Sequence, residues 1–411
     1  MGYLSGAGGH PRSAADGSAA SGAVYLDHAA TTPLLPEAIS AMTEELAQIG
    51  NPSSLHNAGR RARRVVEESR EQIAEVFGAR PSEVIFTSGG TEADNLAVKG
   101  LYWARRAVDR GRRRVLATAV EHHAVLDSVH WLARHEGAEA VFLRVDDTGL
   151  LRPEVLREAI AGDPGSVAVV SVMWANNEVG TVQPVSELAE ITGEYGIAFH
   201  TDAVQAAAQL PVDFAGSGTD ALTITGHKIG APVGAGALLL ARGAEPVPVL
   251  HGGGQEREVR SGTLDAPAIR AFAVAVRITA ERRDEHAKRL AALRNDLIRQ
   301  VVAAVPDAIL NGAPPGPGRL PGNAHFSFPG CEGDALLMLL DAKGIACSTG
   351  SACTAGVAQP SHVLLAMGAD NARARGSLRF SLGHSSAQAD VDAVGAVIGE
   401  AVERARRAAA R

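Results

Sequence analysis

The sequence predicts an α/β protein with a large, mostly parallel sheet covered by helices on both faces, followed by a smaller α+β domain. Two observations lead to this prediction. Short apolar runs typical of buried strands alternate with helical segments from about residue 56 to about residue 265, and a long helical stretch then interrupts the alternation. With 411 residues, the chain also exceeds the size at which one hydrophobic core keeps growing, so about two domains are expected.

The elements of the large domain can be read in order. Residues 56–77 carry apolar residues at helical spacing, and a second helix that begins near residue 91 ends before Gly111. Seven short apolar runs predict strands, at 84–87, 115–119, 140–143, 167–173, 197–200, 221–225 and 237–241. Helical segments separate most of these strands, which is the pattern of a mostly parallel sheet.

The last part of the chain predicts the smaller domain. A helix is expected over 266–305, a loop over 312–322, strands over 324–328 and 378–381, a helix over 333–343 and a final helix. The first 22 residues are rich in Gly, Ala and Ser and predict a disordered extension. The predicted division is this extension at 1–22, an N-terminal segment at 23–37 that packs with the small domain, a large domain at 38–280 and a small domain at 281–411.

Composition and charge narrow the class of protein. Hydrophobic residues make up 46% and charged residues 21%, which is ordinary for a soluble globular enzyme. The 39 Lys and Arg against 46 Asp and Glu give a net charge of −7, so there is no electrostatic case for nucleic acid as the main partner. No apolar run approaches the roughly 18 residues of a membrane span, and a cytoplasmic protein is expected. Three cysteines imply no disulfide framework, although one could be a reactive thiol.

Two charged residues follow predicted strands in a way that suits an aldehyde cofactor. Lys228 lies just beyond the 221–225 strand among small residues, and its amine can form a Schiff base. Asp202 follows the 197–200 strand and can pair with a protonated ring nitrogen, as in enzymes that use pyridoxal 5′-phosphate (PLP). Taken alone, Lys228 is more often a solvated surface lysine, and Asp202 could equally be a helix N-cap.

Three further strand ends carry candidate residues. Gly90 and Thr91 stand between a strand and a helix, where free N–H groups and a hydroxyl can bind a phosphate. His122 can stack on an aromatic ring or move protons, while Asn177 belongs to an Asn pair of a kind common in turns. The adjacent His122 and His123 lack the spacing of a helical metal site, so no metal is expected.

The stretch from residue 347 to residue 356 is small, polar and glycine-containing, which predicts a mobile loop. Cys347 follows an apolar pair and is expected to be semi-buried and inert, whereas Cys353 lies further into the loop. A thiol on a mobile loop can approach a buried cofactor and then swing out to a partner. The spacing of the two cysteines is neither a zinc nor a thioredoxin signature.

The candidate sites at 88–91, 122, 177 and 202–228 all follow the carboxyl ends of predicted strands, so they converge on one edge of one sheet. The surrounding motifs are YLDHAATTP (25–33), TSGGTEADN (87–95), EHHAVLD (121–127), NNEVGTVQ (176–183), DAVQ (202–205), GHK (226–228), RSGT (260–263), STGSACT (348–354) and LRFSLG (378–383). From residue 25 to about residue 400, the sequence resembles the cysteine desulfurases of the NifS/IscS type, within the class V aminotransferases.

The resemblance implies a PLP-dependent transferase of fold type I and assigns roles to matching positions. Lys228, His122 and Cys353 would be catalytic, with Cys353 taking the sulfur. The cofactor would be bound by Gly90, Thr91, His122, Asn177, Asp202, Gln205, Thr225, His227 and Lys228, and by Thr263 from the neighbouring subunit. Asn177 and Arg379 would bind the substrate, since a guanidinium forks onto a carboxylate.

The implied reaction converts L-cysteine to L-alanine and leaves the sulfur on Cys353 as a persulfide. The persulfide would pass to an acceptor such as an iron–sulfur scaffold protein, and the shared role of Thr263 implies a homodimer. Three alternatives stay open on the sequence: an aminotransferase or selenocysteine-preferring lyase, a scaffold or sulfur-relay protein without PLP chemistry, and a redox or metal protein that uses Cys347 and Cys353.

Overall fold

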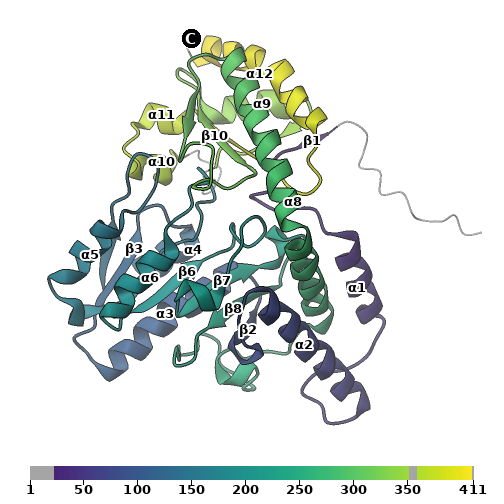
Figure 1. Cartoon of the computed structure of the whole chain (residues 1–411), viewed down its shortest axis with the longest axis vertical. Helices are drawn as coiled ribbons and strands as arrows, with labels where there is room; N and C mark the ends of the chain where they lie inside the picture. The colour runs from purple at the N-terminus through teal and green to yellow at the C-terminus, as the bar shows by residue number, and fades with distance from the viewer. Residues whose placement is uncertain (1–22, 351–358, 410–411) are drawn as a thin grey trace, which may run out of the picture.

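A long helix joins a large α/β part of the molecule to a smaller α+β part (Figure 1). The computed structural model describes residues 23–350 and 359–409, so the predicted extension at 1–22 and Cys353 lie outside the described residues. This architecture confirms the predicted fold class. The exact domain boundaries stay a prediction, because residue 280 falls inside the connecting helix α8 (Ala266–Ala304).

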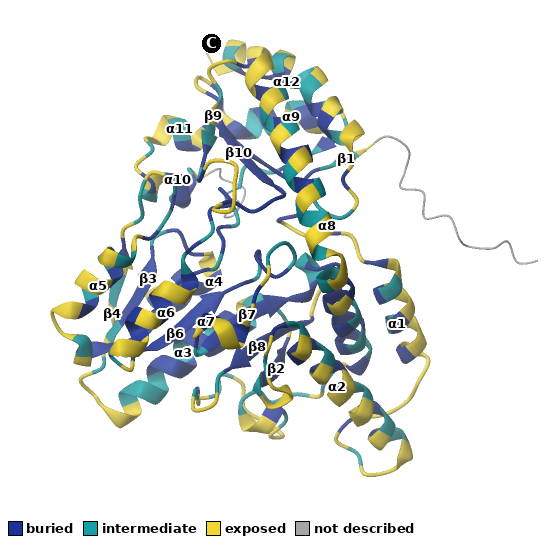
Figure 2. Ribbon diagram, viewed as in Figure 1, coloured by how far each residue is buried: buried dark blue, intermediate teal, exposed yellow. Residues whose placement is uncertain are grey.

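The large part is built on a seven-stranded sheet with the strand order β2-β8-β7-β6-β5-β3-β4. The strands are β2 (Val84–Thr87), β3 (Arg114–Thr118), β4 (Glu139–Leu143), β5 (Val167–Ser171), β6 (Ala198–Asp202), β7 (Ala221–Thr225) and β8 (Gly236–Leu240). Only β8 runs antiparallel to its neighbours in this sheet. Every residue of β5 to β8 is buried, which explains the continuous apolar runs in the sequence (Figure 2).

Helices bury both faces of this sheet. On one face lie α3 (Gly90–Val108) and α4 (His123–Glu136), and on the other lie α1 (Pro36–Leu46), α2 (Asn57–Val76), α5 (Pro153–Ala161), α6 (Val185–Glu194) and the first half of α8. Strand β3 shows the alternation that this requires: Val115 and Ala117 pack in the cluster of α3 and α4, while Leu116 packs in the cluster of α5 and α6. A short helix, α7 (Phe214–Ser217), precedes β7.

The smaller part packs on the second half of α8. Its antiparallel sheet has the order β12-β10-β9, made of β9 (Ile309–Asn311), β10 (Asn323–Ser327) and β12 (Ser377–Ser381). Helices α9 (Gly333–Asp341) and α12 (Gln388–Ala409) share a core with this sheet and with Leu290 and Leu297 of α8. The sequence did not predict α10 (His362–Ala366) or α11 (Asn371–Arg375), because five-residue helices are too short to show a period.

Residues 24–35, called here the N-terminal strap, connect the two parts a second time. Its strand β1 (Val24–Tyr25) pairs in parallel with β11 (Ile345–Ala346), and Ala29 N–H donates to Ser381 Oγ of β12. Further along, Thr32 N–H donates to the carbonyl of His227 and Leu35 N–H to that of Gly230. The strap therefore runs from the small sheet to the loop that carries Lys228. No helix among the described residues is long and apolar enough to cross a membrane.

Candidate active site

A cavity of about 390 Å³ is lined by the strand ends of the large sheet, by the strap and by the small sheet. Ten predicted site residues line it: Gly90, Thr91, His122, Asn177, Asp202, Gln205, Thr225, His227, Lys228 and Arg379. Among the described lining residues Thr263 does not occur, so this chain does not bring it to its own cavity. Cys353 lies outside the described residues, but Ser348 and Gly350, at the start of its loop, reach the cavity.

The start of helix α3 forms one corner of the cavity. Gly89 has φ 147°, which favours glycine, and a Cβ atom on Gly90 would lie only 3.0 Å from the side chain of Val204. This close approach brings the first N–H groups of a 19-residue helix to the cavity, next to Thr91. The acid in this first turn, Glu92, is paired with Arg260 at 2.7 Å, so it opposes a bound anion less. This corner fits a phosphate group.

Asp202 and Asp94 line the large-sheet side of the cavity, and a third buried carboxyl group, Glu121, lies close enough to interact with them electrostatically. Asp202, at the end of β6, is 5% exposed, and burial raises its pKa to about 6 against the opposing effects of the Val204 N–H and the Lys228 charge. Burial also raises the pKa of Glu121 to about 8 and, together with the charge of Asp202, that of Asp94 well above its usual range. Carboxyl groups in such a place fit a ligand with a positive charge, such as a protonated pyridine nitrogen.

Lys228 is placed by a 3₁₀ turn, Gly226–Lys228, that follows β7 directly. Its Nζ donates hydrogen bonds to the carbonyls of Ala29 and Ala30 in the strap, each at 2.5 Å. Burial and the charge of Arg379 lower its pKa to about 8. An amine with a lowered pKa is more often neutral near physiological pH, which is the form that attacks an aldehyde.

His122 caps helix α4, because its Nδ1 accepts a hydrogen bond from Ala124 N–H at 3.1 Å. This bond fixes the orientation of a ring that is otherwise exposed to the cavity. Desolvation and the charge of Lys228 lower its pKa to about 4, so the ring is neutral at physiological pH. A neutral imidazole with one nitrogen committed to the cap can stack on an aromatic ring and exchange a proton through the other nitrogen.

Arg379 projects from β12 of the small sheet and is 4% exposed. Its Nη2 donates to Asp27 Oδ1 at 2.7 Å and its Nη1 to the carbonyl of Asn177 at 3.0 Å. Its Nε has no hydrogen-bond partner among the described residues, although it is buried. Unused donors on a buried guanidinium fit a carboxylate ligand.

Sequence reasoning gave no role to several residues of this site. Asp27, Ala29 and Ala30 belong to a motif of the resemblance, yet nothing local shows that they contact Arg379 and Lys228, which lie some 200 to 350 positions away. Asp94 lines the cavity from helix α3. Its only sequence signal was a polar residue four positions after Gly90, on the same face of the helix.

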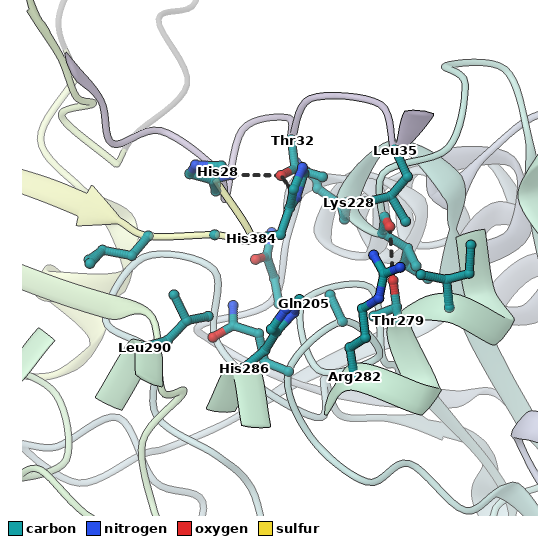
Figure 3. A pocket seen from close by; sticks show the side chains of 16 residues that line it. His28, Thr32, Leu35, Gln205, Lys228, Thr279, Arg282, His286, Leu290 and His384 are labelled. Carbon is teal, nitrogen blue, oxygen red and sulfur yellow. Dashed lines mark hydrogen bonds between the residues drawn. The ribbon is translucent and has the colours of Figure 1, made fainter. Parts of the chain in front are cut away.

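Lys228 also lines a second, smaller cavity of about 50 Å³ (Figure 3). His28, Thr32 and His384 are joined along its wall, with His28 Nδ1 2.6 Å and His384 Nδ1 3.4 Å from Thr32 Oγ1. Lys228 and Gln205 line both cavities. The other eight of the ten predicted site residues line only the larger cavity, so the larger one is the candidate active site.

The chain belongs to the class V aminotransferases: the family described as aminotransferase class-V matches residues 24–394. Enzymes of this family depend on PLP. The family and the cofactor predicted from the sequence are thus confirmed.

The individual proteins that the chain resembles have more specific names than the family as a whole. The chain is 60% identical over 385 residues to an IscS-like cysteine desulfurase of Mycobacterium tuberculosis, covering 94% of this chain and 98% of that one. It is 42% identical to the cysteine desulfurase IscS of Dictyoglomus turgidum, covering 93% and 95%. Among solved structures, it resembles a NifS-like protein with a TM-score of 0.85 at 33% identity, covering 93% of this chain and 100% of that one.

Proposed function

We propose that this chain is a cysteine desulfurase that converts L-cysteine to L-alanine and transfers the sulfur to Cys353 as a persulfide. The observation that carries the proposal is the single cavity in which Lys228, Asp202, His122 and Arg379 meet. Ser348 and Gly350 support it further, because they lead the chain from this cavity toward Cys353. The relatives named cysteine desulfurases cover almost the whole chain.

Each end of the cavity suits one part of the cofactor. Gly90, Thr91, Thr225 and His227 would bind the phosphate, and Asp202 would pair with the ring nitrogen. Bound PLP supplies an electron sink for bonds that break at the α-carbon of the substrate. His122 would stack on the ring, Gln205 and Asn177 would lie along its polar edge, and Lys228 would hold the cofactor through its amine.

The substrate would be oriented by its carboxylate on Arg379, beside Asn177. Lys228, whose pKa is lowered to about 8, would take the proton from the α-carbon and return it later. The Cys353 thiolate would then attack the substrate sulfur, forming an S–S bond as the bond between the substrate Cβ and its sulfur breaks. The electron pair of the broken bond would stay with the amino-acid fragment, whose Cβ takes up a proton before L-alanine leaves. Cys347 is a poor alternative nucleophile, because burial raises the pKa of its thiol to about 12.

We further propose a homodimer, in which Thr263 reaches the phosphate of the neighbouring subunit. This is consistent with the absence of Thr263 from the lining of its own cavity among the described residues. The persulfide would pass to an acceptor protein such as an iron–sulfur scaffold, in the cytoplasm. The active sites would then be complete only in the dimer.

The test is the release of L-alanine and sulfide from L-cysteine in the presence of a reductant. The purified protein is compared with Cys353→Ala, while the colour of the bound cofactor is followed. Loss of both products with the cofactor retained is the expected result. Undiminished turnover by Cys353→Ala would remove Cys353 as sulfur acceptor and favour a lyase or an aminotransferase.

A further inference from the structure

The Arg379 guanidinium is hydrogen-bonded on two sides, and one of its other donors is buried without a hydrogen-bond partner among the described residues. Asp27 Oδ1 accepts from Nη2 at 2.7 Å and the Asn177 carbonyl accepts from Nη1 at 3.0 Å. The side chain of Arg379 is 5% exposed and that of Asp27 21% exposed, so their ion pair is largely shielded from water. The Nε donor, which has no partner in the described part of the chain, belongs to a side chain that lines the cavity. The guanidinium thus has a fixed orientation and a donor left for a ligand.

Asp27 is itself held by the small sheet and its neighbours. It forms a bridge with Ser381, and the next residue, His28, donates its N–H to the Ser381 carbonyl at 3.2 Å. The Leu26 N–H donates to Ala346 of β11 at 2.8 Å, and the Tyr25 hydroxyl donates to the Asp27 carbonyl at 3.2 Å. These bonds fix the backbone on both sides of Asp27, so its carboxylate is a pre-positioned partner for Arg379.

The same strap also holds the catalytic amine. Two and three residues after Asp27, the carbonyls of Ala29 and Ala30 accept hydrogen bonds from Lys228 Nζ. The Ala29 carbonyl accepts a further bond from Gln205 Nε2 at 3.0 Å. A single short segment therefore sets the distance between the group expected to bind the substrate carboxylate and the group expected to act at the α-carbon.

We propose that Asp27 is a positioning residue for the carboxylate of the substrate. By occupying one Nη2 hydrogen, it turns the guanidinium so that Nε and the remaining Nη hydrogens face the cavity as a fork. Without Asp27, the long Arg379 side chain gains rotameric freedom and its charge loses a partner that keeps it in place. This inference rests on the proposed function only in taking an α-amino acid as the ligand.

The test separates binding of the carboxylate from binding of the amine. The PLP-loaded protein is titrated with L-alanine and with ethylamine, which is alanine without its carboxylate, and the change in cofactor absorbance gives both dissociation constants. For Asp27→Asn, we expect L-alanine to bind about tenfold more weakly, because a charge-assisted contact that orients the fork is lost. Ethylamine binding should stay within about twofold. Asp27→Glu keeps the charge but displaces it, and an intermediate loss for L-alanine is expected.

The matched control is Asp307→Asn, which removes another aspartate–arginine pair of the small domain, with Arg406, on the protein surface. It should leave both dissociation constants unchanged. Equal weakening of both ligands in Asp27→Asn would mean that the cofactor site is disturbed, and this result would overturn the proposal. An unchanged or stronger L-alanine affinity would mean that Asp27 only holds Arg379 in the ligand-free protein or competes with the substrate carboxylate for it. That result would overturn the proposal as well. Failure of the wild-type protein to release sulfide from L-cysteine would instead refute the proposed function. The dissociation constants for L-alanine and ethylamine could still be measured and compared.

Discussion

The two sides of the cavity carry ionisable groups of opposite kinds, carboxyl groups on one side and cationic groups on the other. On the large-sheet side, Asp202 and Asp94 line the cavity and Glu121 is buried near them, and burial raises the pKa of each carboxyl group. On the opposite side, Arg379 of the small sheet is buried and the half-buried Lys228, which follows β7, bonds to the strap; burial and the charge of Arg379 lower the pKa of Lys228 to about 8. Each side is thus prepared for a ligand group of the charge opposite to its own.

The two sides differ in how their charges are compensated within the chain. Arg379 has an internal partner in Asp27 and a carbonyl partner in Asn177. The carboxyl groups have no cationic partner as close, and Asp94 Oδ1 and Glu121 Oε2 lack hydrogen bonds within the described residues. The comparison teaches that the small-sheet side is pre-organised by ion pairing, whereas burial on the large-sheet side raises the pKa values of Asp94 and Glu121 and so limits the charge that these two groups carry.

The largest effect is expected for Lys228→Ala. Removing the amine abolishes both the covalent attachment of the cofactor and the base at the α-carbon, so turnover of L-cysteine should fall by about 10³-fold or more. Steady-state alanine release and the cofactor content of the purified protein measure the two losses. The matched control is Lys99→Ala, since Lys99 lies on helix α3 over the Trp131 ring, outside the cavity lining. Comparable turnover in both variants would remove Lys228 from the mechanism.

The site residues that follow strands of the large sheet could be predicted from the sequence. Asp202 and Lys228 follow apolar strands, and the carboxyl ends of parallel strands meet at one edge, so their convergence was predictable without a structure. The structure brings them and eight other predicted residues to one cavity, while their chemical roles stay predictions. Most strands of the large sheet were predictable because their full burial, as in β5 to β8, leaves largely apolar runs in the sequence.

The contacts that cross the molecule were not predictable in this way. The pair of Asp27 and Arg379 joins residues 352 positions apart, and the two-residue strands β1 and β11 show no period. Glu121 stands beside a recognisable histidine, but its burial depends on how Thr118 and Met173 surround it. Local patterns report local structure and burial, whereas these contacts depend on how the small sheet and the strap pack on the large one.

An intermediate effect, on stability rather than turnover, is expected for Glu121→Gln. Its folded-state pKa of about 8 lies far above that of an unfolded glutamate. The folded protein therefore keeps a proton that the unfolded chain releases, so this residue makes stability fall as pH rises from the ordinary carboxyl range toward pH 8. Glutamine stays neutral in both states and can still accept the bonds from the Thr118 hydroxyl and the Met173 N–H at Oε1.

Thermal unfolding of the wild type and of Glu121→Gln at pH 5 and at pH 8.5 tests whether Glu121 makes the stability of the folded protein fall as pH rises. The variant should gain stability relative to the wild type at the higher pH, with the difference shrinking at the lower one. The control is Glu139→Gln, whose side chain is half exposed at the surface. If unfolding stability changes with pH by the same amount in the wild type and in Glu121→Gln, Glu121 is ionised in the folded protein over the whole range.

The smallest effect on activity is expected at Cys347, which stands six positions before Cys353. The thiol of Cys347 is buried in the small-domain core, and burial raises its pKa to about 12, so almost no thiolate forms near neutral pH. Cys347→Ala should keep turnover within about twofold and lose about 1 kcal/mol of unfolding free energy, because one buried sulfur is removed from a packed core. Cysteine turnover and urea unfolding of the same preparation measure both quantities. A folded Cys347→Ala protein without turnover would show that burial does not decide which cysteine of this segment reacts.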